Sequence, residues 1–209
     1  MKIFIDTCVV RFSQEERRQW LKQKEPVNLF GKLQEVEIVR GHVDSPQDKI
    51  DNDKQLRDAK ASVEIAKLLA TKQVQGVWQF ETLFEWGRTK KMGISAPSIN
   101  QYMEVADPPC HYTRVLFDPD QDVQFNFLRN LNQERYVDWK KACGVVKGSK
   151  KELNQLMDAW NLWSAEHNEC DFFLTVDYKL IRSVNSRNIE SNLELITPTE
   201  FINRMEYAF

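Results

Sequence analysis

The sequence predicts an α/β fold: a three-layer α/β/α sandwich around a central parallel sheet of four to five strands. Short apolar runs at 2–6 and 171–175 read as strands that are buried on both faces. The apolar residues of 53–72 and 153–163 recur instead at helical spacing. Acidic residues stand at the ends of the strand-like runs, where open parallel sheets place their sites.

Composition is that of an ordinary globular protein. With 209 residues, 42% of them hydrophobic and 29% charged, the chain suits one domain spanning 1–209. Its net charge of −2 means that the chain as a whole does not attract nucleic acid, so a polyanion would have to bind a local patch of positive charge. Four scattered cysteines and three unclustered histidines make a zinc site a poor fit. Free thiols and the lack of a long apolar run lead us to expect a cytoplasmic protein without a membrane partner.

The first half of the chain begins with a strand at 2–6 that ends on Asp6. Ser13 and Glu16 have capping-box spacing, which predicts a helix to about Gln23 that Pro26 stops. Further expectations are an extra strand at 36–39, a surface loop at 41–53 and an amphipathic helix at 53–72.

The second half continues with a strand at 74–79 and a helix at 80–91 that carries Glu81 and Glu85. A long connection at 93–113 should lead to a third strand at 114–117, a capping turn at 118–122 and a helix at 121–135. Ser149 and Glu152 predict the capped start of a helix that carries Asp158. A strand at 171–175, a helix at 178–184, a strand at 193–196 and a helix from Pro198 to about 206 complete the order.

Asp158 and Asp177 should lie at the same level of the fold. From Asp158 the helix covers about 14 Å to His167 at ~1.5 Å per residue, and the strand at 171–175 returns roughly 16 Å at ~3.3 Å per residue. Both acids therefore reach the carboxyl edge, where Asp6 also stands. Two carboxylates about 4 Å apart repel by about 4 kcal/mol at an effective dielectric near 20, so such a group either protonates or binds a cation.

These residues resemble the PIN domain, the metal-dependent nuclease fold of bacterial toxin ribonucleases and RNA-processing enzymes. The resemblance rests on five segments in order: Ile-Phe-Ile-Asp6-Thr, Thr82-Leu-Phe-Glu85, Asp158-Ala-Trp-Asn-Leu, Phe-Leu-Thr175-Val-Asp177 and Leu-Ile-Thr-Pro198-Thr-Glu-Phe-Ile. It leaves about 25–60 and 95–150 unmatched, as insertions in a single PIN-like domain.

The resemblance implies that Asp6, Glu85, Asp158 and Asp177 hold a divalent metal and that Thr175 orients a water or a carboxylate. Glu81 competes with Glu85 for its role. Cys8, Asn161 and Trp163 depart from the usual pattern, which commonly has serine or asparagine, histidine and a small residue there.

The expected activity is hydrolysis of single-stranded RNA with Mg²⁺ or Mn²⁺, the cations that all-oxygen ligand sets suit. A group of lysines before the Asp158 helix is expected to attract phosphate, because its last two members start that helix: Lys140, Lys141, Lys147, Lys150 and Lys151. Trp139 is a candidate for stacking on a base. An inhibitory antitoxin-like partner and a homodimer are expectations at the level of the family.

Two other functions remain open. The first is a PIN-like module that binds nucleic acid or protein without catalysis. The second is a phosphatase of the haloacid-dehalogenase type, whose first strand also ends in Asp. That chemistry needs a second Asp two residues later, where this chain has Cys8.

Overall fold

The computed structural model describes residues 1–13, 17–79, 98–111, 122–187 and 189–207. Its centre is a five-stranded, all-parallel sheet in the order β5-β4-β1-β6-β7. The strands are β1 (Lys2–Ile5), β4 (Gln75–Trp78), β5 (Met103–Val105), β6 (Phe172–Leu174) and β7 (Glu194–Ile196). The predicted α/β architecture with a parallel sheet is confirmed.

The central strand β1 is buried on both faces, as its unbroken apolar run predicts. Phe4 pairs in register with Val77 of β4 and Phe173 of β6, and all three belong to one hydrophobic cluster. Ile3 and Ile5 point to the opposite face and belong to a second cluster. The sheet therefore separates two cores, each covered by its own helices.

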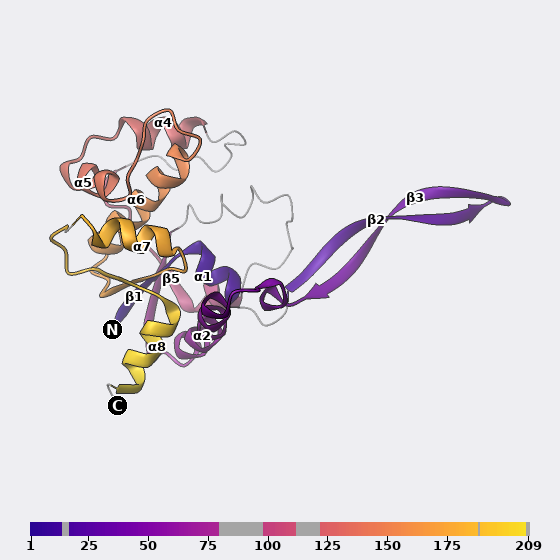
Figure 1. Cartoon of the computed structure of the whole chain (residues 1–209), viewed down its shortest axis with the longest axis horizontal. Helices are drawn as coiled ribbons and strands as arrows, with labels where there is room; N and C mark the ends of the chain where they lie inside the picture. Colours follow the sequence, from indigo (N-terminus) through magenta and orange to yellow (C-terminus); the bar gives the residue numbers. More distant parts are fainter. Residues whose placement is uncertain (14–16, 80–97, 112–121, 188, 208–209) are drawn as a thin grey trace.

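Helices lie on both sides of the sheet, which gives three layers (Figure 1). The cluster around Phe4 and Phe173 draws on α4 (Asp122–Asn130), α5 (Glu134–Ala142), α6 (Glu152–His167) and α7 (Tyr178–Asn185). The cluster around Ile3 and Ile5 draws on α1 (Thr7–Phe12), α2 (Asp53–Ala70) and α8 (Pro198–Tyr207). None of the helices within the described residues is long and apolar enough to cross a membrane.

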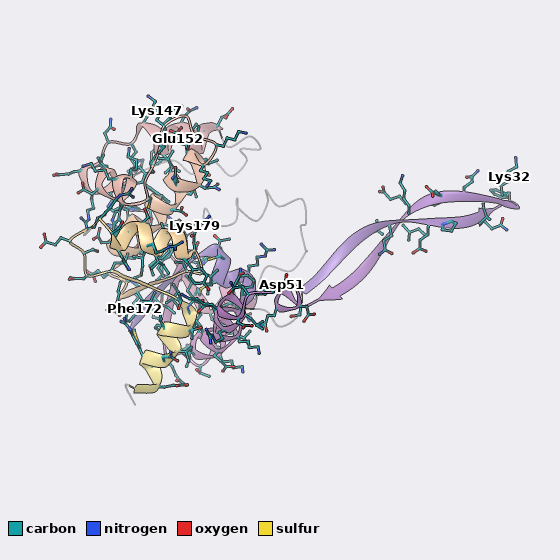
Figure 2. The ribbon with its side chains drawn as sticks, in the orientation of Figure 1. Lys32, Asp51, Lys147, Glu152, Phe172 and Lys179 are labelled. Carbon is teal, nitrogen blue, oxygen red and sulfur yellow. The ribbon has the colours of Figure 1, made fainter. Side chains whose placement is uncertain are left out.

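A long antiparallel hairpin projects from this body, formed by β2 (Arg17–Leu29) and β3 (Lys32–Asp44) (Figure 1). Its tip is a two-residue turn with Phe30 and Gly31 at φ 53° and 79°, the left-handed conformations that two-residue hairpins favour. Phe30 is fully exposed there. Figure 2 labels Lys32, the first residue of β3, at this end of the hairpin.

The hairpin corrects two predictions. The helix expected up to Gln23 is wrong, because residues 17–29 form β2. Pro26 does not stop a helix; it lies within a strand of a two-stranded ribbon, where every strand is an edge that tolerates a missing N–H. The loop expected at 41–53 is also wrong in part, because 41–44 belong to β3 and Pro46–Lys49 form a short 3-10 helix. The strand expected at 36–39 is confirmed as part of β3.

The middle of the chain differs in three further places. A short 3-10 helix (Ser98–Tyr102) and β5 occupy part of the expected connection at 93–113. The expected helix at 121–135 ends at Asn130, and α5 follows as a separate helix. The expected helix at 80–91, strand at 114–117 and most of the turn at 118–122 lie outside the described residues. The elements expected at 53–72, 74–79 and from 152 onward are confirmed to within a few residues at their ends.

The start of α6 is fixed by a carboxylate rather than by the expected capping box. The N-cap residue Lys151 makes no side-chain cap hydrogen bond, and the buried Glu152 carboxylate accepts a hydrogen bond from the Gly148 N–H at 2.5 Å. The same carboxylate forms an ion pair with Arg129 of α4 at 3.1 Å. Glu152 therefore ties α6 to α4 at the end of the layer where Figure 2 labels Lys147 and Glu152.

Candidate functional site

Three of the predicted site residues follow two adjacent strands. Asp6 comes directly after β1 and precedes the first turn of α1. Thr175 comes directly after β6, and Asp177 caps the N-terminus of α7. Because β1 and β6 pair in parallel, their carboxyl ends meet at one edge of the sheet and bring these residues together.

A hydrogen-bonded network centres on one oxygen of Asp6. Asp6 Oδ2 accepts from the Thr175 hydroxyl at 2.6 Å and from the Cys8 thiol at 2.8 Å. The Thr175 hydroxyl in turn accepts from the Asp177 N–H at 3.0 Å, and Cys8 Sγ accepts from the Val176 N–H at 3.3 Å. Thr175 therefore fixes the Asp6 carboxylate relative to the backbone of Asp177.

The electrostatics of this edge disfavour negative charge. Burial raises the pKa of Asp6 against the hydrogen bonds from Cys8 and Thr175, and the nearby Asp177 charge raises it as well. Burial, followed by the Asp6 charge, raises the pKa of the Cys8 thiol well above its usual value. The thiol thus stays protonated and serves as a hydrogen-bond donor, not as a nucleophile.

The remaining predicted acids are placed differently. Asp158 is half-buried on α6, and its charge adds to burial in raising the pKa of Cys143. Glu85 and its competitor Glu81 lie outside the described residues. Across the described ranges, no three His, Cys, Asp or Glu side chains are grouped so as to hold a metal ion. Asp6, Thr175 and Asp177 are the part of the predicted site that the structure shows assembled.

The chemistry of this assembled part fits a hard divalent cation. Both acids offer carboxylate oxygens, the donors that Mg²⁺ and Mn²⁺ prefer. Asp177 Oδ1 accepts from the N–H groups of Lys179 and Leu180 at 2.8 and 3.0 Å, which holds its carboxylate rigidly at the helix start. A cation would offset both the burial of Asp6 and its repulsion from Asp177, so these two residues suit two positions of a ligand set.

Two buried carboxamides near this edge are not part of the sequence prediction. Gln79 follows β4 and is fully buried; its Nε2 donates to Ser164 Oγ on α6 at 2.9 Å, while its Oε1 has no hydrogen-bond partner within the part of the chain that the structure describes. Asn161 of α6 is 3% exposed, and its Oδ1 likewise finds no hydrogen-bond partner among the described residues. The sequence signal for both is a polar amide on an otherwise apolar face, one after a buried strand and one inside a buried helix.

The five candidate phosphate-binding lysines divide into two groups. Lys140 is half-buried and donates to the Leu131 carbonyl at 2.7 Å, and burial lowers its pKa. Lys141 is exposed and donates to Asp138 at 3.3 Å. Lys147, Lys150 and Lys151 are exposed beside the start of α6. These three lysines therefore place exposed positive charge beside a helix N-terminus, and their binding of phosphate stays a prediction.

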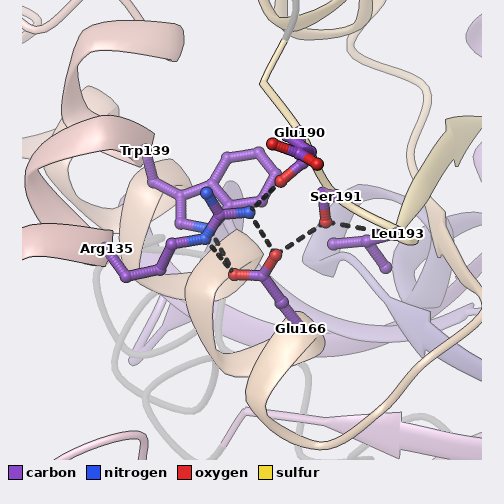
Figure 3. Close-up of polar contacts among 6 residues, drawn as sticks. All are labelled: Arg135, Trp139, Glu166, Glu190, Ser191 and Leu193. Atoms are coloured by element: carbon purple, nitrogen blue, oxygen red, sulfur yellow. Dashed lines mark hydrogen bonds and ion pairs between the residues drawn. The ribbon is translucent and has the colours of Figure 1, made fainter.

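Trp139 does not offer a face for base stacking, because its side chain is 1% exposed. It belongs to a polar network that joins α5, α6 and the segment before β7 (Figure 3). Glu166 of α6 accepts from the Trp139 indole, from the Ser191 hydroxyl and, through both of its oxygens, from Arg135. Arg135 also donates to the Glu190 carbonyl at 2.7 Å. The network fixes α6, and with it Asp158, against the neighbouring helix.

Glu166→Gln is expected to lower the free energy of unfolding by about 1 to 2 kcal/mol at pH 7, because it removes the charged acceptor of several hydrogen bonds. Although burial alone would raise it, the hydrogen bonds from Arg135, Ser191 and Trp139 lower the pKa of Glu166. The stabilisation is therefore present above the unfolded value of about 4.3 and is lost as pH falls through the folded pKa.

Urea unfolding of both proteins between pH 3 and pH 7 checks this prediction. Glu194→Gln is a matched control, since Glu194 pairs with Arg204 through side chains that are each 50% exposed. Its effect should be smaller at pH 7 because exposed pairs are screened by water. If the difference in free energy of unfolding between the wild type and Glu166→Gln stays constant from pH 3 to pH 7, the ionised Glu166 is not the source of the stabilisation.

Comparison with known proteins gives no match to any family model and none to a curated protein.

Proposed function

We propose that this chain is a metal-dependent endoribonuclease of the PIN type, which hydrolyses phosphodiester bonds of single-stranded RNA. One observation carries the proposal: Asp6 and Asp177 meet at the carboxyl edge of a parallel sheet, with Asp6 buried and linked through Thr175 to the backbone of Asp177. An energetically unfavourable pair of acids at the usual ligand-binding edge of such a fold favours a cation-dependent function.

Asp6 and Asp177 would hold Mg²⁺ or Mn²⁺, and the proposal assigns Asp158 and Glu85 as the further carboxylates. When bound, such a cation activates a water and neutralises charge that develops on the phosphodiester. Thr175 and Cys8 orient Asp6 by donating to its Oδ2. The first turn of α7 orients Asp177 through two backbone N–H groups. These contacts fix the ligands before substrate arrives, which keeps the cost of reorganisation low.

The RNA backbone is proposed to approach over the start of α6. Lys147, Lys150 and Lys151 are exposed there, and α6 runs from them toward Asp158 within about two turns. Neutralising all three lysines should weaken RNA binding and reduce its salt dependence, because each phosphate contact releases condensed counterions. A filter-binding titration at several salt concentrations measures both effects. An unchanged slope of affinity against salt would place the RNA path elsewhere.

Phosphatase chemistry of the haloacid-dehalogenase type is disfavoured by Cys8. That mechanism needs an acid two residues after the first Asp, whereas the protonated Cys8 thiol donates to Asp6 and has a raised pKa. It cannot exchange protons with a leaving group near neutral pH.

The test of the proposed function is a cleavage assay on mixed single-stranded RNAs and DNAs with Mg²⁺, with Mn²⁺ and with EDTA. Metal-dependent cleavage of RNA within the strand, abolished by EDTA, is the expected result. If no substrate is cut, the melting temperature with and without Mn²⁺ separates two cases. An Asp6-dependent rise retains the metal site and rejects the tested substrates, whereas no rise supports the non-catalytic binding module.

A further inference from the structure

We propose that the carboxamides of Gln79 and Asn161 line the metal site, where their carbonyl oxygens act as neutral ligands for the divalent cation. This inference rests on the proposed function and extends it to two residues outside the carboxylate set. Divalent cations are coordinated by amide carbonyl oxygens as well as by carboxylates. Such ligands add oxygen donors without adding to the repulsion between Asp6 and Asp177.

The register of the sheet places Gln79 beside Asp6. Phe4 of β1 pairs with Val77 of β4, so the positions two residues further along each strand, Asp6 and Gln79, come level at the carboxyl edge. Phe4 and Val77 lie in the same hydrophobic cluster, on the α6 side. Because side chains in strands alternate between faces, Asp6 and Gln79 are directed to that side as well.

Thr175 completes this row on the other flank of Asp6. Phe4 pairs with Phe173 of β6, so Thr175 stands level with Asp6 and is directed to the same face. Its hydrogen bond to Asp6 Oδ2 confirms that placement. Gln79, Asp6 and Thr175 therefore line the top of the sheet beneath α6.

The helix brings Asn161 over this row. Gln79 Nε2 donates to Ser164, which fixes the height of α6 relative to the strand ends. Asn161 lies three residues before Ser164, about 4.5 Å nearer to the carboxyl edge along the helix axis. Asp158 lies a further three residues away, on the same side of α6. Along α6, Asn161 thus lies between Ser164, which contacts Gln79, and Asp158.

The unpartnered oxygens are costly unless a ligand satisfies them. A buried carbonyl without a hydrogen bond destabilises a fold, and Gln79 Oε1 and Asn161 Oδ1 are two such oxygens among the described residues. Gln79 is held in place because its amide nitrogen is bonded to Ser164. A bound cation would satisfy both oxygens and would also reduce the repulsion between Asp6 and Asp177.

Asn161→Leu and Gln79→Met test this role, since both keep side-chain volume while removing the oxygen. Isothermal titration with Mn²⁺ should show affinity reduced by about 10-fold or more, the scale at which supporting residues act on metal sites. The melting temperature in EDTA should stay equal or rise, because an unsatisfied buried oxygen has been replaced by an apolar group. Ser62→Ala is the matched control: its hydroxyl is fully buried on α2, on the other side of the sheet, and should leave Mn²⁺ affinity unchanged.

The two proposals fail separately. If both amide variants bind Mn²⁺ as tightly as the wild type while Asp6→Asn loses binding, Gln79 and Asn161 are not metal ligands. The nuclease assignment is then retained. Absence of Mn²⁺ binding by the wild type overturns both. If Asn161→Leu does not fold, Asn161→Asp decides: tighter Mn²⁺ binding supports a ligand position, and unchanged binding overturns it.

Discussion

Asp6→Asn should lose about 10³-fold or more of metal-dependent cleavage, since removing one charged ligand forfeits several kcal/mol of metal-derived stabilisation of the transition state. Its stability in EDTA should stay equal or rise. Burial and the neighbouring Asp177 both disfavour the ionised Asp6, while an asparagine oxygen still accepts from Thr175. Single-turnover cleavage and thermal unfolding in EDTA measure the two effects.

Asp171→Asn provides the matched control for this prediction. Asp171 is an exposed acid at the opposite edge of the sheet, where its Oδ2 accepts from the Lys2 N–H at 2.7 Å. The same chemical change there should leave cleavage unaltered. A variant of Asp6 that unfolds in EDTA would show that the carboxylate stabilises the fold, and retained cleavage would remove Asp6 from the site.

Trp160→Ala is expected to lower the free energy of unfolding by about 3 to 5 kcal/mol, the range for truncation of a large buried aromatic. Trp160 is 1% exposed at the centre of α6. Its ring packs edge to face against Phe127, Tyr136 and Trp163, with centroids 5.9, 6.2 and 5.7 Å away. The loss therefore includes packing between α6 and both α4 and α5.

Urea unfolding of the variant beside Phe30→Ala measures this effect. Phe30 is an aromatic residue at the exposed tip of the hairpin, so its truncation removes no buried contact and should change stability by less than about 0.5 kcal/mol. Equal effects of the two substitutions would mean that the aromatic cluster around Trp160 contributes little to folding.

Local patterns explain which elements the sequence predicts well. Strands β1, β4, β6 and β7 are apolar runs buried on both faces, and α2 and α6 carry apolar residues at helical spacing. Such patterns indicate directly which residues are buried, so they predict the element without information on its partners in the fold. The prediction of a helix up to Gln23 is wrong because no such local pattern determines this segment. The strand conformation of residues 17–29 depends on pairing with β3, a partner distant in sequence from Arg17.

The same division applies to the site. The sequence by itself determined that Asp6, Thr175 and Asp177 meet at the carboxyl edge, because acids and hydroxyls at the ends of adjacent parallel strands have little freedom to lie elsewhere. Only the tertiary structure decided that Cys8 donates to Asp6, that Trp139 is buried, and that Gln79 and Asn161 keep unpartnered oxygens. Those features depend on register and on the height of α6 above the sheet, which non-local packing sets.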